Sequence, residues 1–336
     1  MIPSPAAAND RQTALALAVK ALEAGHEVAL VTVLETYGSA PRRPGSLWVI
    51  VDPSGSKPRQ AGSVSGGCVE DDLLDWLAAH PDLARVGRPV ERQFDGTTHP
   101  GLPCGGILSV LVEWPRQAAD LRPALAAVSR REAVWREIDL AKGRVGFYPI
   151  DGVVPESPSR GESTLAVPFG PAWRLAIIGT GPVAEALAPQ ALSLGFEVNV
   201  CDPRAHADWS VPGVAWHREA PERFFAATGL DARTAVVAVA HDPRLDDLAL
   251  MDALESTAFH VAAMGGASTS RARRDRLAAL GVDAGRLRAP AGLDIGSHTP
   301  AEIAVSMAAE LVAARHLERQ RSTPMQPAAR HALDAG

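Results

Sequence analysis

The hydrophobic pattern of the first 150 residues predicts a small domain of mixed helices and strands. Residues 10–24 carry apolar side chains at helical spacing, and Gly25 follows as a glycine C-cap. Apolar runs rich in β-branched residues predict strands at 27–34, 46–51 and 107–114, and a second amphipathic stretch predicts a helix at 69–79. Residues 38–45 contain two prolines and two glycines, so we expect a loop there.

The pattern changes at Arg174, where short apolar strands begin to alternate with amphipathic helices. We expect strands at 175–178, 197–201, 235–240 and 260–263, and helices at 183–194, 245–255 and 270–280. Thr299-Pro300-Ala301-Glu302 is a capping-box sequence with proline at the first helical position, and it opens a helix to about residue 314. This alternation is typical of a doubly wound parallel sheet. The chain is therefore predicted to be an α/β protein with a C-terminal Rossmann-like sheet (173–315), preceded by a smaller mixed α+β N-terminal domain (1–150).

Two further segments differ in composition from these domains. Residues 151–172 are rich in Pro, Gly, Ser and Glu with little hydrophobic periodicity, so we expect an interdomain linker. Residues 316–336 are polar and rich in Pro and Ala, which predicts a disordered tail.

Charge and cysteine content narrow the class of protein. A net charge of −6 without a long basic run argues against nucleic-acid binding. For the basic cluster at 271–276 we favour a solvated helix face over a phosphate-binding patch. The three cysteines lie far apart, which indicates a reducing compartment and not a disulfide framework. The N-terminus lacks the basic stretch of a signal peptide, and no apolar run reaches the roughly 18–20 residues that span a membrane. We expect a cytoplasmic protein without a membrane partner.

A glycine-rich segment with a cysteine, residues 62–70, is the first candidate site. Glycines let a ligand approach the main chain, and the start of the following helix offers unpaired N–H groups that favour an anion and lower a thiol's pKa. The segment therefore combines an anion cradle with a reactive thiol, Cys68. A second combination of a cysteine with glycines occurs at Cys104-Gly105-Gly106, directly before the predicted strand at 107–114.

A second glycine loop, Gly179-Thr180-Gly181-Pro182-Val183-Ala184, lies between a predicted strand and helix. This is the G-x-G-x-x-A form of the dinucleotide-binding fingerprint, in which the second glycine lets the backbone meet a pyrophosphate. The fingerprint's acidic partner is expected about 20 residues on. Asp202 lies 23 positions after Gly179, at the end of the next strand, and would bind ribose hydroxyls.

Other interpretations of this second loop stay open. The crevice of a Rossmann-like fold can be empty. Arg204 suits either an additional phosphate or a surface salt bridge, and His241, at the end of the third strand, suits either a ligand contact or a structural role.

These blocks, together with Ala289-Pro290-Ala291-Gly292-Leu293-Asp294-Ile295-Gly296, resemble the XdhC/CoxI family in content and order over about residues 10–315. The family comprises accessory factors of xanthine dehydrogenase and related molybdenum hydroxylases. The resemblance implies a chaperone that binds the molybdenum cofactor, as molybdopterin or a molybdopterin dinucleotide, assists its sulfuration and inserts it into the apo-hydroxylase. It also implies a cysteine desulfurase and a molybdenum cofactor nucleotidyltransferase as further partners. The oligomeric state stays open, and a homodimer with two cofactor loops near its interface is one arrangement compatible with it.

The resemblance assigns cofactor-binding roles to residues of both domains. They are Arg42, Arg43, Ser63, Gly66, Gly67, Cys68, Cys104, Gly105 and Gly106 in the first domain, and Gly179, Gly181, Asp202, Arg204 and His241 in the second, whose crevice would hold a nucleotide. The Cys68 thiolate would contact molybdenum or pass sulfur, and Cys104 would do the same or support it. The planar donors of Arg42 and Arg43 suit a phosphate or a pterin carbonyl. Cys201, inside a predicted strand, is interpreted as a core residue.

Two departures from the family pattern concern the ligand. Ser65 stands where a glycine is usual, which narrows the backbone conformations open to the first loop. The family's Gly-Ser-Arg element after the fourth Rossmann strand is replaced by Met264-Gly265-Gly266-Ala267-Ser268-Thr269-Ser270-Arg271, so an arginine near the crevice is displaced or lost.

Three rival functions remain beside a maturation factor without turnover of its own. An NAD(P)-dependent oxidoreductase would use Gly179, Gly181 and Asp202, but the chain has no Tyr-x-x-x-Lys pair, and its tyrosines are Tyr37 and Tyr148. A thiol-based redox or sulfur-carrier protein would pair Cys68 with Cys104. An interaction scaffold would use neither loop. Fold alone does not choose among them.

Overall fold

The computed structural model describes residues 10–38, 42–96, 106–204 and 209–321. Within these ranges the chain forms two compact units, Asp10–Pro171 and Ala172–Arg321, and each is described by itself. Among the described residues, none of the helices has the length and hydropathy needed to cross a membrane.

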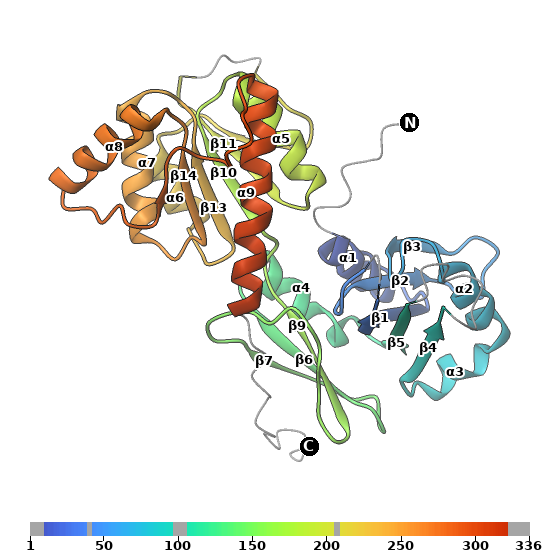
Figure 1. Ribbon diagram of the computed structural model, residues 1–336. Helices are drawn as coiled ribbons and strands as arrows, with labels where there is room; N and C mark the ends of the chain where they lie inside the picture. The colour runs from blue at the N-terminus through green and yellow to red at the C-terminus, as the bar shows by residue number, and fades with distance from the viewer. Residues whose placement is uncertain (1–9, 39–41, 97–105, 205–208, 322–336) are drawn as a thin grey trace. The chain divides into compact units, whose positions relative to one another are not determined.

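The first unit contains a five-stranded antiparallel sheet, sheet A, and a four-stranded antiparallel sheet, sheet B (Figure 1). Sheet A has the order β3-β2-β1-β5-β4, and sheet B has the order β7-β6-β9-β8. The strands are β1 (Val28–Tyr37), β2 (Leu47–Val51), β3 (Arg59–Gly62), β4 (Val90–Asp95), β5 (Ile107–Glu113), β6 (Val134–Asp139), β7 (Val145–Pro149), β8 (Ser159–Arg160) and β9 (Thr164–Phe169). The helices are α1 (Asp10–Glu23), α2 (Glu70–Ala79), α3 (Pro81–Val86), the 3₁₀ turn η1 (Ala118–Asp120) and α4 (Arg122–Ser129).

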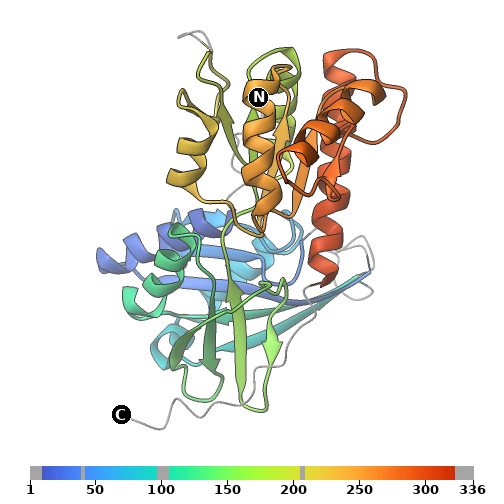
Figure 2. The same ribbon diagram turned by 90° about the vertical axis from the view of Figure 1, so that its left-hand side faces the viewer.

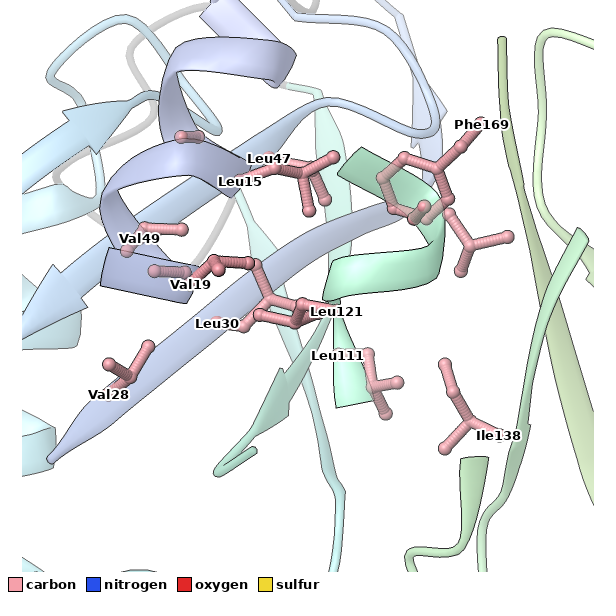
Figure 3. Close-up of a cluster of buried hydrophobic side chains, with 14 of the residues drawn as sticks. Leu15, Val19, Val28, Leu30, Leu47, Val49, Leu111, Leu121, Ile138 and Phe169 are labelled. Atoms are coloured by element: carbon pink, nitrogen blue, oxygen red, sulfur yellow. The ribbon is translucent and has the colours of Figure 1, made fainter. Parts of the chain in front are cut away.

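Sheet A is buried on both faces because the side chains of β1 alternate between two cores. Val28 and Leu30 pack into a cluster with Leu15 of α1 and with Ile138 and Phe169 of sheet B, which Figure 3 shows. Residues of α4 belong to the same cluster. Val31 packs into the opposite cluster, against α2, together with Leu73. The unbroken apolar run that predicts the strand reflects this double burial.

Residues 151–172, which we expected to be a linker, instead contribute to sheet B. β9 pairs antiparallel with β6, and Leu165, Val167 and Phe169 of β9 are buried in the core shared with α1. The expectation was wrong because the six-residue strand lies between segments rich in turn-forming residues that dominate the local composition.

A buried ion pair connects the two sheets of the first unit. Arg136 of β6 donates to both carboxylate oxygens of Glu113 of β5, at 3.0 and 3.1 Å, and to the carbonyl of Asp120 at 3.0 Å. Both side chains are almost fully buried. The bidentate geometry satisfies a charge that would otherwise be costly to bury.

The second unit is built on a six-stranded parallel sheet of order β12-β11-β10-β13-β14-β15. Its strands are β10 (Arg174–Ile178), β11 (Glu197–Cys201), β12 (Ala215–His217), β13 (Thr234–Ala238), β14 (His260–Ala263) and β15 (Leu287–Arg288). Its helices are α5 (Pro182–Ser193), α6 (Pro221–Thr228), α7 (Pro243–Glu255), α8 (Ala267–Ala279) and α9 (Pro300–Arg321). The predicted Rossmann-like α/β class is confirmed.

Helices cover both faces of this parallel sheet (Figures 1 and 2). Leu175 and Ile177 of β10 pack with α5 and α9, whereas Ala176 and Ile178 pack with α6 and α7. Cys201 is fully buried in the second cluster, as expected for a core residue, and burial is the main cause that raises its pKa to about 12. α9 extends to Arg321, so the expected disordered tail is wrong for residues 316–321, and the remainder lies outside the described residues.

Candidate functional site

The loops that contain the candidate residues of the first unit leave sheet A at one end. Tyr37, the last residue of β1, pairs with Ile107, the first residue of β5, and Gly38 approaches Gly106 closely. β3 ends at Gly62, which pairs with Trp48 near the start of β2. The segments with Arg42, Cys68 and Cys104 therefore begin or finish at the same end of the sheet. Cys104 and Gly105 themselves lie outside the described residues.

The loop before α2 folds around the carboxylate of Glu70, the first residue of that helix. Oε1 accepts hydrogen bonds from the Ser63 hydroxyl at 2.6 Å and from the backbone N–H groups of Val64 and Ser65 at 3.0 and 2.9 Å. Oε2 accepts from the Ser65 hydroxyl and from the N–H groups of Gly67 and Val69, the last two at 3.0 and 3.2 Å. An anion cradle is present, as the sequence indicates, but a carboxylate of the chain itself already pairs with it.

These hydrogen bonds keep Glu70 ionised. Burial raises its pKa, but the hydrogen bonds from Ser63, Ser65 and Val64 stabilise the charged form and lower the pKa to about 2. The side chain is 9% exposed, so few of its acceptor sites face solvent. From the sequence, Glu70 stood out only as the end of the glycine segment. The missed signal is an acidic residue at a helix start, directly after a run of small residues.

Ser65 is accommodated in the loop without strain. The left-handed φ angles of the loop fall on Gly62, Gly66 and Gly67, and Ser65 is not among the residues with positive φ. Its hydroxyl contacts Glu70 and accepts the N–H of Val69 at 2.9 Å. The serine that departs from the family pattern thus strengthens the hydrogen bonding around Glu70.

The Cys68 side chain is half-buried, and its thiol is free. It packs against the cluster on the α2 face of sheet A, and within the described ranges it forms neither a disulfide nor a hydrogen bond. Arg42 is half-buried and Arg43 is exposed. Within the described parts of the chain, no group of three or more His, Cys, Asp or Glu side chains is arranged to hold a metal ion.

The second glycine loop has the geometry that its fingerprint predicts. Gly179 has φ +105°, and a Cβ there would lie 2.6 Å from the backbone nitrogen of Ala240, so only glycine fits. Gly181 is the N-cap of α5 and makes no side-chain cap, and nothing lies within 4 Å of a Cβ built on it. The start of α5 is therefore open to close approach by a ligand.

Asp202 binds this loop instead of pointing into open space. Its Oδ2 accepts the Thr180 N–H at 3.0 Å and hydroxyl at 3.1 Å, and its Oδ1 accepts the Arg204 N–H at 2.9 Å and Nε–H at 3.1 Å. Arg204 also contacts Asp242 at 2.8 Å. Burial raises the pKa of Asp202, but the bonds from Arg204 and Thr180 outweigh it and lower the pKa. A ribose would have to share oxygens that already have partners.

A pocket of about 550 Å³ lies at the carboxyl edge of the parallel sheet. It is lined by the starts of α5 and α9, by His241 and by segments that follow β14 and β15: Pro182, Val183, His241, Met264, Gly265, Gly266, Pro290, Ala291, Ser297, His298, Pro300 and Ile303. His241 is exposed and has a left-handed φ of +57°. Of the predicted residues, His241 lines the pocket, and Pro182 and Val183, which directly follow Gly181, line it too. Gly179, Gly181, Asp202 and Arg204 are not among its lining residues.

The segment from Met264 to Gly266 is held by an arginine that we expected on a solvated helix face. Arg273 of α8 is buried, and its guanidinium contacts Asp246 at 3.0 Å, Asp247 at 3.3 Å and the Met264 carbonyl at 2.9 Å. Arg271 is exposed as expected. The expectation for Arg273 was wrong because its guanidinium pairs with Asp246 and Asp247 of α7, two consecutive acidic residues that neutralise its charge on burial.

Known proteins resemble this chain along nearly its whole length. The Escherichia coli (strain K12) protein named molybdenum cofactor insertion chaperone PaoD is 28% identical over 325 residues, which span 94% of this chain and 92% of that protein. A Bacillus subtilis (strain 168) protein, named as a probable subunit of xanthine dehydrogenase, is 26% identical, over 88% of this chain and 95% of that protein. A solved structure from Bacillus halodurans, described as a xanthine dehydrogenase, has a TM-score of 0.69 at 22% identity over 92% of this chain and 98% of that one.

Family models match both units. The model described as XdhC and CoxI family matches residues 21–88, which include the Cys68 loop, and the model described as XdhC Rossmann domain matches residues 175–311, which include the pocket. Together the two models cover more than half of the chain. The chain belongs to the XdhC and CoxI family.

Proposed function

We propose that this chain is a maturation factor that binds the molybdenum cofactor and inserts it into a hydroxylase of the xanthine dehydrogenase or aldehyde oxidase type. A relative of nearly the same length, named as a molybdenum cofactor insertion chaperone, supports the role. The observation that carries the proposal is the Cys68 thiol, which stands half-exposed and unbonded in a loop that is already folded around Glu70. The chain has no turnover of its own in this proposal.

The residues present fit a molybdenum-bearing pterin as cargo. A thiolate is a soft ligand and a sulfur nucleophile, so Cys68 would contact the metal centre or relay sulfur delivered by a cysteine desulfurase. Arg42 and Arg43 would donate to the phosphate or to a pterin carbonyl. Gly106 directly precedes β5, at the same end of sheet A, and we propose that Cys104 and Gly105 share its cofactor-binding role.

The pocket of the second unit would hold a nucleotide. Its volume lies within the range of small-molecule sites, and the open start of α5 at Gly181 suits a phosphate. His241 lines the pocket and would contact the base or ribose. The nucleotide is either the extension of a molybdopterin dinucleotide, supplied through a nucleotidyltransferase, or an independent one.

Purification from a host that makes the molybdenum cofactor tests the proposal. We expect wild-type chain to retain pterin, measured by fluorescence after oxidative release. The Cys68→Ala variant should lose at least the ~10-fold that removal of an outer-shell partner already costs a metal site. Cys201→Ala is the matched control, since that thiol is buried in β11 and should leave pterin content unchanged. A wild-type chain that binds NAD⁺ tightly and never contains pterin would instead support an oxidoreductase.

A further inference from the structure

In the loop that contains Cys68, a side chain of the protein itself accepts the hydrogen bonds that an anionic ligand would accept. Loops that gather several backbone N–H groups and hydroxyls around one point usually do so for a bound anion. Here four backbone N–H groups and two hydroxyls converge on the carboxylate of Glu70. We propose that Glu70 is the positioning residue of Cys68: it occupies the loop's anion-binding groups from within and thereby fixes the thiol for the cofactor.

The backbone N–H groups that donate to Glu70 belong to residues on both sides of Cys68 in the sequence. Val64 and Ser65 donate from before the cysteine, Gly67 donates from the preceding residue and Val69 donates from the following one. Cys68 itself takes no part. The conformation of the residues around the thiol therefore depends on the carboxylate, while the thiol stays free to react.

The glycines beside Cys68 explain why the loop needs such a fixed point. Gly66 and Gly67 have φ angles of +80° and +108°, and nothing lies within 4 Å of a Cβ built on Gly67. The space where a side chain would lie at Gly67 is therefore empty. Without the carboxylate, these glycines would let the loop move through many conformations and carry Cys68 with them.

A consequence concerns what the loop offers to the cofactor. Because the N–H groups of Val64, Ser65, Gly67 and Val69 are paired with Glu70, those four donors are not available to the cofactor's phosphate. The loop presents a thiol, and phosphate recognition falls to side chains such as Arg42 and Arg43 at the same end of sheet A. This consequence rests on the proposed function, whereas the positioning of Cys68 by Glu70 does not.

Removing the carboxylate and supplying an anion from solution tests the positioning role. In Glu70→Ala, iodoacetamide should alkylate Cys68 at least roughly tenfold faster than in wild type, because the loop opens locally. Mass spectrometry of the Cys68 peptide separates this reaction from that of the other cysteines. Acetate at increasing concentration should fill the vacated groups and return the rate toward wild type, whereas chloride at matched ionic strength should not. Wild type should respond to neither salt.

Variants of different charge keep the test decisive if the alanine variant does not fold. Glu70→Gln has nearly the native size but places an amide NH₂ against N–H donors, so it should behave like the opened loop. Glu70→Asp keeps the charge on a shorter stem and should lie closer to wild type than Gln, both in alkylation rate and in retained pterin.

Three outcomes would overturn the inference. The first is a Cys68 alkylation rate in Glu70→Ala equal to that of wild type. The second is an accelerated rate that acetate leaves unchanged. The third is a Gln variant indistinguishable from the Asp variant. If wild type contains no pterin while the contrast in alkylation stands, the proposed function fails and the positioning role of Glu70 survives.

Discussion

Gly179→Ala should destabilise the second unit by about 3 kcal/mol, because two costs combine. The backbone there has φ +105°, a conformation that L residues rarely adopt, and the added Cβ would lie 2.6 Å from the Ala240 backbone. Backbone cannot move aside as the end of a flexible side chain can. Since Ala240 precedes His241, any shift would also disturb the pocket. For a unit of this size we expect the melting temperature to fall by roughly 6–12 °C.

Gly229→Ala provides the matched control for this experiment. Gly229 lies in the same unit with φ +70°, and nothing lies within 4 Å of its added Cβ. Only the positive-φ backbone, with φ +70° and ψ 159°, then opposes the substitution, at a cost of about 1–2 kcal/mol. Equal losses in the two variants, measured by thermal and urea unfolding, would show that close packing of the glycine loop against Ala240 is unimportant.

Arg273→Ala should cost about 3–5 kcal/mol of unfolding free energy, because it breaks a buried ion pair and leaves the partner charge behind. Asp246 is 1% exposed, and within the described part of the chain the Ala240 N–H at 3.1 Å would be its remaining hydrogen-bond donor. The Met264 carbonyl would also lose its donor. Because that carbonyl lies beside Gly265 and Gly266, nucleotide affinity should fall together with stability.

The loss in this variant should depend on pH. Burial raises the pKa of Asp246 to about 6, although the charge of Arg273 opposes the shift, and removing Arg273 should raise the pKa further. A carboxyl whose folded-state pKa is raised favours the folded state as pH falls, so the deficit should be smaller at pH 5 than at pH 8. Arg271→Ala, an exposed change on the same helix, should alter stability by less than about 0.5 kcal/mol at either pH. A deficit that grew on acidification would contradict this account of the ion pair.

Most helices and strands of the second unit could be predicted from the sequence, because the spacing of apolar residues there matches the faces that are buried in the structure. The strands at 175–178 and 260–263 are buried on both faces, so their unbroken apolar runs are unambiguous. β9 escaped prediction although it is equally buried, because its six residues lie between turn-rich segments. Composition averaged over such a window reports the flanking turns and hides the strand.

The backbone geometry of the two glycine loops follows from the sequence, but the hydrogen-bond partners inside each loop do not. Glycine spacing indicates where the chain takes positive φ angles, since that requirement is a local property of the backbone. The spacing does not predict which group accepts the hydrogen bonds of each loop. Glu70 fills the first cradle and Asp202 ties the second, and both contacts need the three-dimensional path of the chain. Arg273 was misplaced for the same reason, because its acidic partners lie 26 and 27 positions earlier on α7.

If this chain delivers a molybdenum cofactor to a hydroxylase, as we propose, a transfer measurement tests that delivery most directly. Chain loaded with pterin is mixed with the apo form of a xanthine dehydrogenase-type enzyme, the two are separated, and pterin is measured in each. We expect pterin to leave the chain and to arrive in the hydroxylase in equal amount, together with hydroxylase activity. Pterin that stays on the chain, or activity that arises equally well from free cofactor alone, would contradict the account.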